Sequence, residues 1–210
     1  MKLPYVLIVV GGLVIIGSAW WFLAPHERAM SCASLPMKPS VIAFGDSLVA
    51  GYGAETGKDF VSVLSESTDI PIQNLGRNGD TTASARTRLK EVIAAKPDIV
   101  IVLLGGNDAL QGASVEDTER NLSKILDMLQ REGIEVILAG VLGGFPTDPY
   151  APMFRRLADT HPVLFVPNIL SGVIENREMM SDAIHPNSAG YARIAERLLP
   201  LLADSCARLE

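Results

Sequence analysis

Three residues that could together carry out nucleophilic chemistry lie far apart in this sequence. Ser47 follows an apolar run in "VIAFGDSL", and His185 lies near the carboxyl end in "DAIHP". A serine hydroxyl is a poor nucleophile until a base removes its proton, and histidine is the side chain suited to that role near neutral pH. Asp182 precedes His185 by three residues, so a single helical-type turn would bring its carboxylate to the imidazole and fix the tautomer. The sequence thus predicts a nucleophile, a base and an orienting carboxylate.

Donors for a developing oxyanion can be assigned to two further segments. The tetrahedral intermediate of acyl transfer needs N–H groups aimed at its oxyanion, and one such donor is typically worth about 100- to 1000-fold in rate. The candidates are the backbone N–H of Ser47, the backbone N–H of Gly79 in "NLGRNGDTT" and the side-chain amide of Asn107 in "GGND". Asp46 is expected to shape the serine turn, and Asp108 to support its neighbours without touching substrate.

Each of these residues also has an ordinary structural explanation. Ser47 and Gly79 could be plain turn residues, Asn107 could cap a helix, and His185 before Pro186 could simply enter one, since proline suits a first helical turn. The chemical interpretation therefore depends on the elements that would bring all of them together.

Those elements are predicted by short apolar runs that alternate with amphipathic stretches. The expected strands cover residues 41–44, 72–75, 99–104, 136–139 and 163–166. Helical spacing of apolar residues occurs between and after them, at Leu89, Val92 and Ile93, at Leu122, Ile125, Leu126 and Leu129, and at Ile194, Ala195 and Leu198. This alternation predicts an α/β fold with a mainly parallel five-stranded sheet. All the candidate residues would then gather at the carboxyl edge of the sheet, where ligands bind in such folds.

The segments "FGDSL", "GRNGDTT", "GGND" and "DAIHP" occur in this order and resemble the four sequence blocks of the SGNH (GDSL) hydrolase family, most closely its thioesterase I/lysophospholipase L1-like branch. The resemblance covers roughly residues 40–202. It implies a flavodoxin-like three-layer α/β/α fold, no metal and no other cofactor. It also implies the catalytic roles position by position, with Ser47 as nucleophile, Gly79 and Asn107 as oxyanion donors, and Asp182 with His185 as the remaining pair.

Composition restricts the partners. The formal net charge is −6, with no basic footprint, so nucleic acid is not an expected partner. Two lone cysteines and three scattered histidines suggest no metal site. We interpret the chain as a monomeric serine esterase for ester or thioester bonds of small or lipid-like acyl substrates. An acyltransferase using the same residues is one alternative. A non-catalytic binding module is another, and it would be expected to have lost at least one of the five positions.

The N-terminal segment indicates a membrane anchor. Residues 3–24 contain no charged side chain and end in two tryptophans and a phenylalanine, residue types that favour the membrane interface. At roughly 1.5 Å per residue, a helix of this length would cross a bilayer core of about 30 Å. We therefore expect an anchor at 1–24, a tether at 25–38 and a hydrolase domain at 39–206. Lys2 weakly favours a cytoplasmic N-terminus, which puts the domain in the periplasm of a bacterial inner membrane.

Two other leader types compete with the anchor, and all three export the domain. A cleaved secretory signal could end near Ala29-Met30-Ser31, and a lipoprotein signal could end at Cys32. Export would allow a disulfide. Cys32 precedes the first expected strand and Cys206 follows the last expected helix. Both should lie at the sheet edge opposite the active site, so we predict that they pair.

Overall fold

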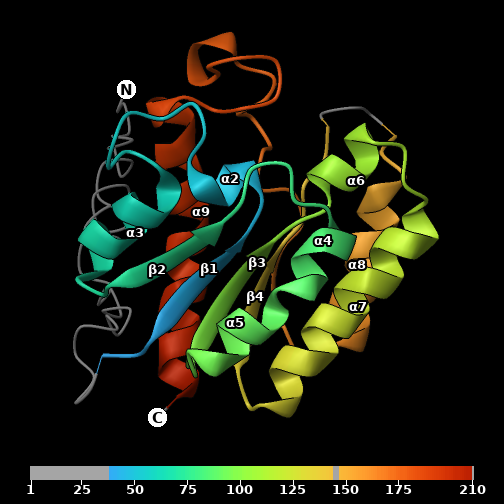
Figure 1. Cartoon of the computed structure of the whole chain (residues 1–210). Coiled ribbons are helices and arrows are strands. Elements are labelled where there is room, and N and C mark those ends of the chain that lie inside the picture. Colours follow the sequence, from blue (N-terminus) through green and yellow to red (C-terminus); the bar gives the residue numbers. More distant parts are fainter. Residues whose placement is uncertain (1–37, 144–146, 210) are drawn as a thin grey trace, which may run out of the picture.

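The computed structural model describes residues 38–143 and 147–209, and the centre of the fold is a five-stranded sheet (Figure 1). The strand order is β2-β1-β3-β4-β5, and every neighbouring pair is parallel. This is the flavodoxin-like order of doubly wound α/β proteins, in which ligands bind at the carboxyl ends of the strands. The strands are β1 (Val41–Gly45), β2 (Ile72–Gly76), β3 (Ile99–Leu103), β4 (Glu135–Ala139) and β5 (Leu164–Val166).

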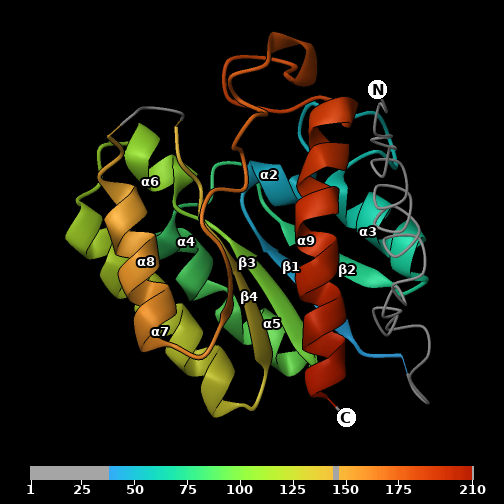
Figure 2. The same ribbon diagram turned by 180° about the vertical axis from the view of Figure 1, so that it is seen from behind.

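Helices cover both faces of the sheet, as Figures 1 and 2 show. One face packs against α2, α3 and α9, and the other against α4, α5, α7 and α8. The three-layer prediction is thereby confirmed. The bounds are α2 (Ser47–Ala50), α3 (Phe60–Thr68), α4 (Thr82–Thr87), α5 (Leu89–Ala94), α6 (Gly106–Leu110), α7 (Val115–Arg131), α8 (Tyr150–Thr160) and α9 (Ser188–Arg208), with a short 3₁₀ helix, η2 (Arg177–Met179).

The central strands β1 and β3 are buried along their whole length. The sequence of a strand that is covered on both faces is a continuous apolar run, because alternate side chains enter opposite cores. Accordingly, Ile42 and Phe44 of β1 pack on the α4–α8 side, whereas Val41 and Ala43 pack on the α3–α9 side. All five predicted strands are confirmed to within one residue at either end.

The register aligns the ends of three strands. Gly45 at the end of β1 pairs with Gly76 of β2 and with Leu103 of β3. The segments that follow these strands therefore start side by side at one edge of the sheet. Both glycines are required by close approach: a Cβ on Gly45 would lie 2.1 Å from the Leu103 carbonyl oxygen, and one on Gly76 would lie 2.1 Å from the Ala50 nitrogen.

The three predicted helical patterns correspond to α5, α7 and α9. One detail of the last prediction was wrong. α9 continues to Arg208, so Cys206 lies inside the helix, where it is buried, rather than beyond its end. The sequence pattern gave no sign of this continuation, because Pro200 lies inside the helix and proline is unfavourable in a helix interior.

The predicted anchor, most of the tether and Cys32 lie outside the described residues. Within residues 38–143 and 147–209, no helix is long and apolar enough to cross a bilayer. The anchor and the Cys32–Cys206 pair therefore remain predictions.

Candidate active site

Ser47 is the first residue of the short helix α2, which begins immediately beyond β1. Asp46 caps this helix: its Oδ1 accepts a hydrogen bond from the Leu48 N–H at 3.0 Å. The carbonyl of Asp46 accepts from the Ala50 N–H at 3.0 Å, which closes the first turn. The predicted role of Asp46 in shaping the serine turn is confirmed. Ser47 thus begins a helical turn two residues beyond the end of β1, and Asp46 caps that turn.

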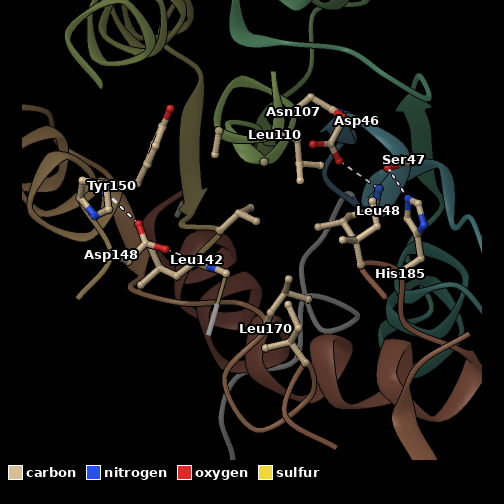
Figure 3. Close-up of a pocket in the computed structure, with 17 residues that line it drawn as sticks. Asp46, Ser47, Leu48, Asn107, Leu110, Leu142, Asp148, Tyr150, Leu170 and His185 are labelled. Atoms are coloured by element: carbon tan, nitrogen blue, oxygen red, sulfur yellow. Dashed lines mark hydrogen bonds between the residues drawn. The ribbon is translucent and has the colours of Figure 1, made fainter. Parts of the chain in front are cut away.

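The side chains of Ser47, His185 and Asp182 form a hydrogen-bonded chain, of which Figure 3 shows the contact between Ser47 and His185. His185 Nε2 lies 3.0 Å from Ser47 Oγ, although 138 residues separate the two in the sequence. On the other side of the ring, His185 Nδ1 lies 2.8 Å from Asp182 Oδ2. In the neutral tautomer that satisfies both contacts, Nδ1–H donates to the carboxylate and Nε2 accepts from the serine hydroxyl. The structure therefore brings together three residues that the sequence predicted as partners.

Asp182 reaches His185 through a turn of a different kind from the one expected. Its Oδ1 accepts from the backbone N–H groups of Ile184 and His185, at 2.9 and 2.8 Å. This is a side-chain-closed turn, and no helix includes these residues; the helical-type turn was therefore wrong. Desolvation acts to raise the pKa of Asp182, but the hydrogen bonds from Ile184 and His185 outweigh it, and the pKa lies below its ordinary value.

The histidine loop packs against the segment that follows α2. The ring of Tyr52 lies 4.5 Å from the ring of His185, centroid to centroid, at 48°. The Tyr52 carbonyl accepts from the buried Tyr191 hydroxyl of α9 at 2.8 Å. Gly53 has φ of +93°, and a Cβ there would lie 2.2 Å from Ser181 Oγ. No pattern in the sequence pointed to Tyr52, because its contact with His185 joins residues 133 positions apart.

Asn107 lies on α6 and shares a cavity wall with Ser47 and His185. Its Nδ2 donates to the main-chain oxygen of Asp80 at 3.0 Å. An amide NH₂ has two donors, so the second remains for a ligand. Gly79 has φ of +82° in the turn closed by Asp80 N–H and the Arg77 carbonyl. It is absent from the residues that line the cavity, and its role as a donor stays a prediction.

Asp108 joins the third sequence block to the second. It is buried, and its two oxygens accept from the Thr82 backbone N–H at 2.8 Å and the Thr82 hydroxyl at 2.5 Å. These bonds hold the start of α6 against the start of α4. The predicted supporting position of Asp108 is confirmed.

Asp46 lies near two other carboxyl groups and is 2% exposed. Burial raises the pKa of Asp46 from 3.8 to about 7, and the charges of Asp80 and Asp108 add to this. Because the folded protein holds this proton more tightly than the unfolded chain, the Asp46 contribution to stability is complete below pH 3.8 and falls as pH rises towards about 7.

We expect Asp46→Asn to remove this pH dependence. Asparagine retains an acceptor for the Leu48 N–H and carries no charge. As pH rises from about 4 to 8, the free energy of unfolding of the native chain should fall by roughly 4 kcal/mol relative to that of the variant. Urea unfolding of both proteins across this range measures the difference. Parallel pH curves would mean that Asp46 is ionised throughout. Asp159→Asn, an exposed change on α8, is the control.

A cavity of about 360 Å³ opens beside Ser47. Its walls come from α2, α6, the segment after β4, the start of α8, the loop after β5 and the loop that carries His185, and most of them are apolar (Figure 3). The apolar lining residues are Leu48, Ala109, Leu110, Val141, Leu142, Pro149, Tyr150, Leu170, Ile174 and Ile184. Asp148, also in the wall, is held by the backbone N–H groups of Gly143 and Tyr150 at 3.0 and 2.9 Å. The cavity thus offers an apolar site next to a hydrogen-bonded serine.

Comparisons with known proteins agree with this geometry. The model of the GDSL-like lipase/acylhydrolase family matches residues 43–193. The chain is 30% identical over 175 residues to esterase TesA of Pseudomonas aeruginosa, covering 78% of this chain and 87% of that protein. It is 27% identical over 166 residues to thioesterase 1/protease 1/lysophospholipase L1 of Escherichia coli, covering 75% of this chain and 80% of that protein.

A solved structure points to the same family. AlinE4, described as an SGNH-hydrolase family esterase, has a TM-score of 0.64 at 34% identity and covers 84% of this chain and 98% of its own. The family match includes the segments of Ser47, Gly79, Asn107, Asp182 and His185. The chain therefore belongs to the GDSL-like lipase/acylhydrolase family and is an SGNH ester hydrolase.

Proposed function

We propose that the protein is a serine esterase that cleaves carboxylic ester or thioester bonds and holds the acyl group in the cavity beside Ser47. The observation that carries this proposal is the short contact between Ser47 Oγ and His185 Nε2, 3.0 Å, in a base whose other nitrogen is held by Asp182. A nucleophile, a base within hydrogen-bond reach and a group that orients the base are the requirements of covalent acyl transfer.

In the acylation step, Ser47 Oγ attacks the carbonyl carbon of the ester while its proton passes to His185 Nε2. The resulting imidazolium is stabilised by the Asp182 carboxylate at Nδ1. When the tetrahedral intermediate collapses, the bond to the leaving oxygen or sulfur breaks, and the leaving group takes the proton from Nε2. A water molecule then gives a proton to His185 Nε2 and attacks the acyl carbon. The bond from this carbon to Ser47 Oγ breaks, Oγ takes the proton back from Nε2, and the acid is released.

The oxyanion is assigned to the free N–H of the Asn107 amide and to the backbone N–H groups of Ser47 and Gly79. We expect Asn107→Ala to lower kcat by about 100- to 1000-fold with little change in KM, because the oxyanion exists only near the transition state. Steady-state kinetics with a p-nitrophenyl ester measures both constants. Gln130→Ala, which removes an amide near the carboxyl end of α7, is the control. A rise in KM alone would reassign Asn107 to ground-state binding.

The cavity and the relatives support the proposed substrate class. Apolar walls favour an acyl chain, since transfer of apolar surface out of water contributes about 25 cal/mol per Å². The relatives are named for esterase, thioesterase and lysophospholipase activities. The substrates are therefore small or lipid-like acyl esters of the arylesterase, acyl-thioesterase or lysophospholipase type.

A panel of p-nitrophenyl esters and acyl thioesters of increasing acyl length tests this assignment. We expect kcat/KM to rise with acyl length until the cavity is filled and then to level off or fall. A flat profile would contradict the cavity as the acyl site. An alcohol acceptor added to the same reactions tests the alternative chemistry: accumulation of the new ester in place of free acid would identify an acyltransferase.

The site of action is proposed from the uncharged run at residues 3–24. An anchor there would hold the enzyme at the bacterial inner membrane with its active site in the periplasm. Protease treatment of spheroplasts measures this orientation. Digestion of the domain without lysis is the expected result, and protection until lysis would contradict it.

A further inference from the structure

We infer that Arg88 is a positioning residue that holds all three oxyanion donors in place; this inference rests on the proposed function. Arg88 lies between α4 and α5 and is 5% exposed. It is absent from the cavity wall, so it acts on substrate only through other residues. Its side chain nevertheless joins the segments that carry the first, second and third sequence blocks.

The guanidinium of Arg88 donates to three acceptors, one at the end of β1 and two in the segment 74–82. Nε donates to Asp80 Oδ2 at 2.6 Å, and Nη2 also pairs with this carboxylate. Nη1 donates to the Leu75 carbonyl at 2.9 Å, and Nη2 to the Gly45 carbonyl at 2.9 Å. The group also lies 4.4 Å from the centre of the Phe44 ring, on the strand that leads to Ser47.

Two of the three acceptors lie close to a proposed oxyanion donor. Gly45 is two residues before Ser47, and Asp80 directly follows Gly79. The main-chain oxygen of Asp80 in turn accepts from Asn107 Nδ2 at 3.0 Å. One side chain is thus linked, directly or through Asp80, to the three segments whose relative positions define the oxyanion site.

The chemistry of arginine explains why this residue type is needed. Its planar group presents five N–H donors in a fixed fork, whereas a lysine ammonium is a point charge on a flexible stem. A lysine at this position retains the charge but cannot reproduce the fork toward Asp80, Leu75 and Gly45 together. Buried ion pairs often add little to the free energy of unfolding. The buried Arg88–Asp80 pair is therefore better explained by a role in fixing the geometry of these segments.

The test compares Arg88→Lys and Arg88→Met with two controls. Because a displacement of about 1 Å at a reacting centre can cost roughly 100-fold in rate, we expect Arg88→Met to lower kcat by about that factor with KM nearly unchanged. Arg88→Lys should show a smaller loss of the same kind. Arg86→Met, an exposed change on α4, should match the native enzyme. Leu129→Ala, a core change on α7, lowers the melting temperature and serves as the control for lost stability.

A double-mutant cycle separates positioning from general destabilisation. If Arg88 acts through the oxyanion donors, Arg88→Lys should cost much less in the Asn107→Ala background than in the native enzyme, because coupled residues are non-additive. Two results would overturn the inference. One is a pair of losses in kcat that simply add in the double variant. The other is a loss of kcat in Arg88→Lys and Arg88→Met that is no greater than the loss in Leu129→Ala at equal melting temperature. A kcat for Arg88→Met within twofold of the native value would overturn it as well.

Amide hydrogen exchange gives a readout that does not depend on activity. We expect Arg88→Lys to speed exchange in residues 45–48 and 76–80 and to leave β4 and β5 unchanged. Unchanged exchange in the first two segments would overturn the inference even if the enzyme were active. If the native protein hydrolysed esters without needing Ser47, the proposed function would fail, and the exchange measurement would still decide whether Arg88 holds these loops.

Discussion

Replacement of Ser47 by alanine is expected to lower kcat for ester hydrolysis about a million-fold, as loss of the nucleophile does in other serine hydrolases. The hydroxyl is the atom that forms the acyl-enzyme, and it lies 3.0 Å from the His185 nitrogen that takes its proton. The side chain lies at the cavity wall, outside both apolar cores. The variant should therefore fold normally, as judged by circular dichroism and thermal unfolding.

The control for this change is Ser67→Ala, which removes an exposed hydroxyl on α3 and should leave turnover unchanged. Activity of Ser47→Ala within tenfold of the native enzyme, in a preparation free of other esterases, would contradict the mechanism. Loss of activity together with loss of cooperative unfolding would instead indicate that the hydroxyl is needed by the fold.

The second large effect is expected for Asp182→Asn, which should lower kcat about 10,000-fold. The asparagine amide would present its NH₂ toward His185 Nδ1, favouring the tautomer that places the ring proton on Nε2, where it cannot accept from Ser47. The negative charge that stabilises the imidazolium would also be lost. Because the pKa of Asp182 lies below its ordinary value, the carboxylate is ionised wherever the native enzyme is assayed above pH 4.

Steady-state rates between pH 5 and pH 9 measure this effect. Asp159→Asn, an exposed change on α8, is the matched control and should retain the native rate. A native rate and an unchanged pH profile in Asp182→Asn would show that another group orients His185. A normal melting temperature is expected in both variants, since Asp182 lies in an exposed loop.

The sheet and the edge where the site lies were predictable because they depend on local patterns. β1 and β3 are continuous apolar runs, and such runs mark strands buried on both faces. β1 is followed at once by Asp46-Ser47, and β3 is followed after one residue by Gly105. Parallel strands place all such ends at one edge. The order of the strands along the sequence was therefore enough to predict that Ser47, Gly79 and Asn107 lie near one another.

Other parts of the site depend on contacts that no local pattern contains. Tyr52 is an ordinary loop tyrosine until the loop of His185 folds over it. Arg88 follows a helix of six residues, and its partners at Gly45 and Leu75 lie 43 and 13 positions away. The turn at Asp182 could not be distinguished from a helical one, because both bring residues three apart together.

The cavity was also beyond the reach of the sequence. Its walls combine side chains from six separate stretches of the sequence. One of them includes the start of α8, which follows a proline-containing stretch with no clear period. Volume and shape arise from tertiary packing, which the helical and strand periods do not encode.

Covalent trapping of the nucleophile is the most direct measurement of the proposed chemistry. A p-nitrophenyl alkylphosphonate reacts with an activated serine and leaves a stable tetrahedral adduct. Mass spectrometry of the digested protein should find one phosphonyl group per chain, on Ser47, with loss of activity in proportion to labelling. No adduct should form in Ser47→Ala, and formation should be strongly slowed in Asp182→Asn. Inactivation with the phosphonyl group on any other residue, or full labelling without loss of activity, would contradict the assignment of Ser47.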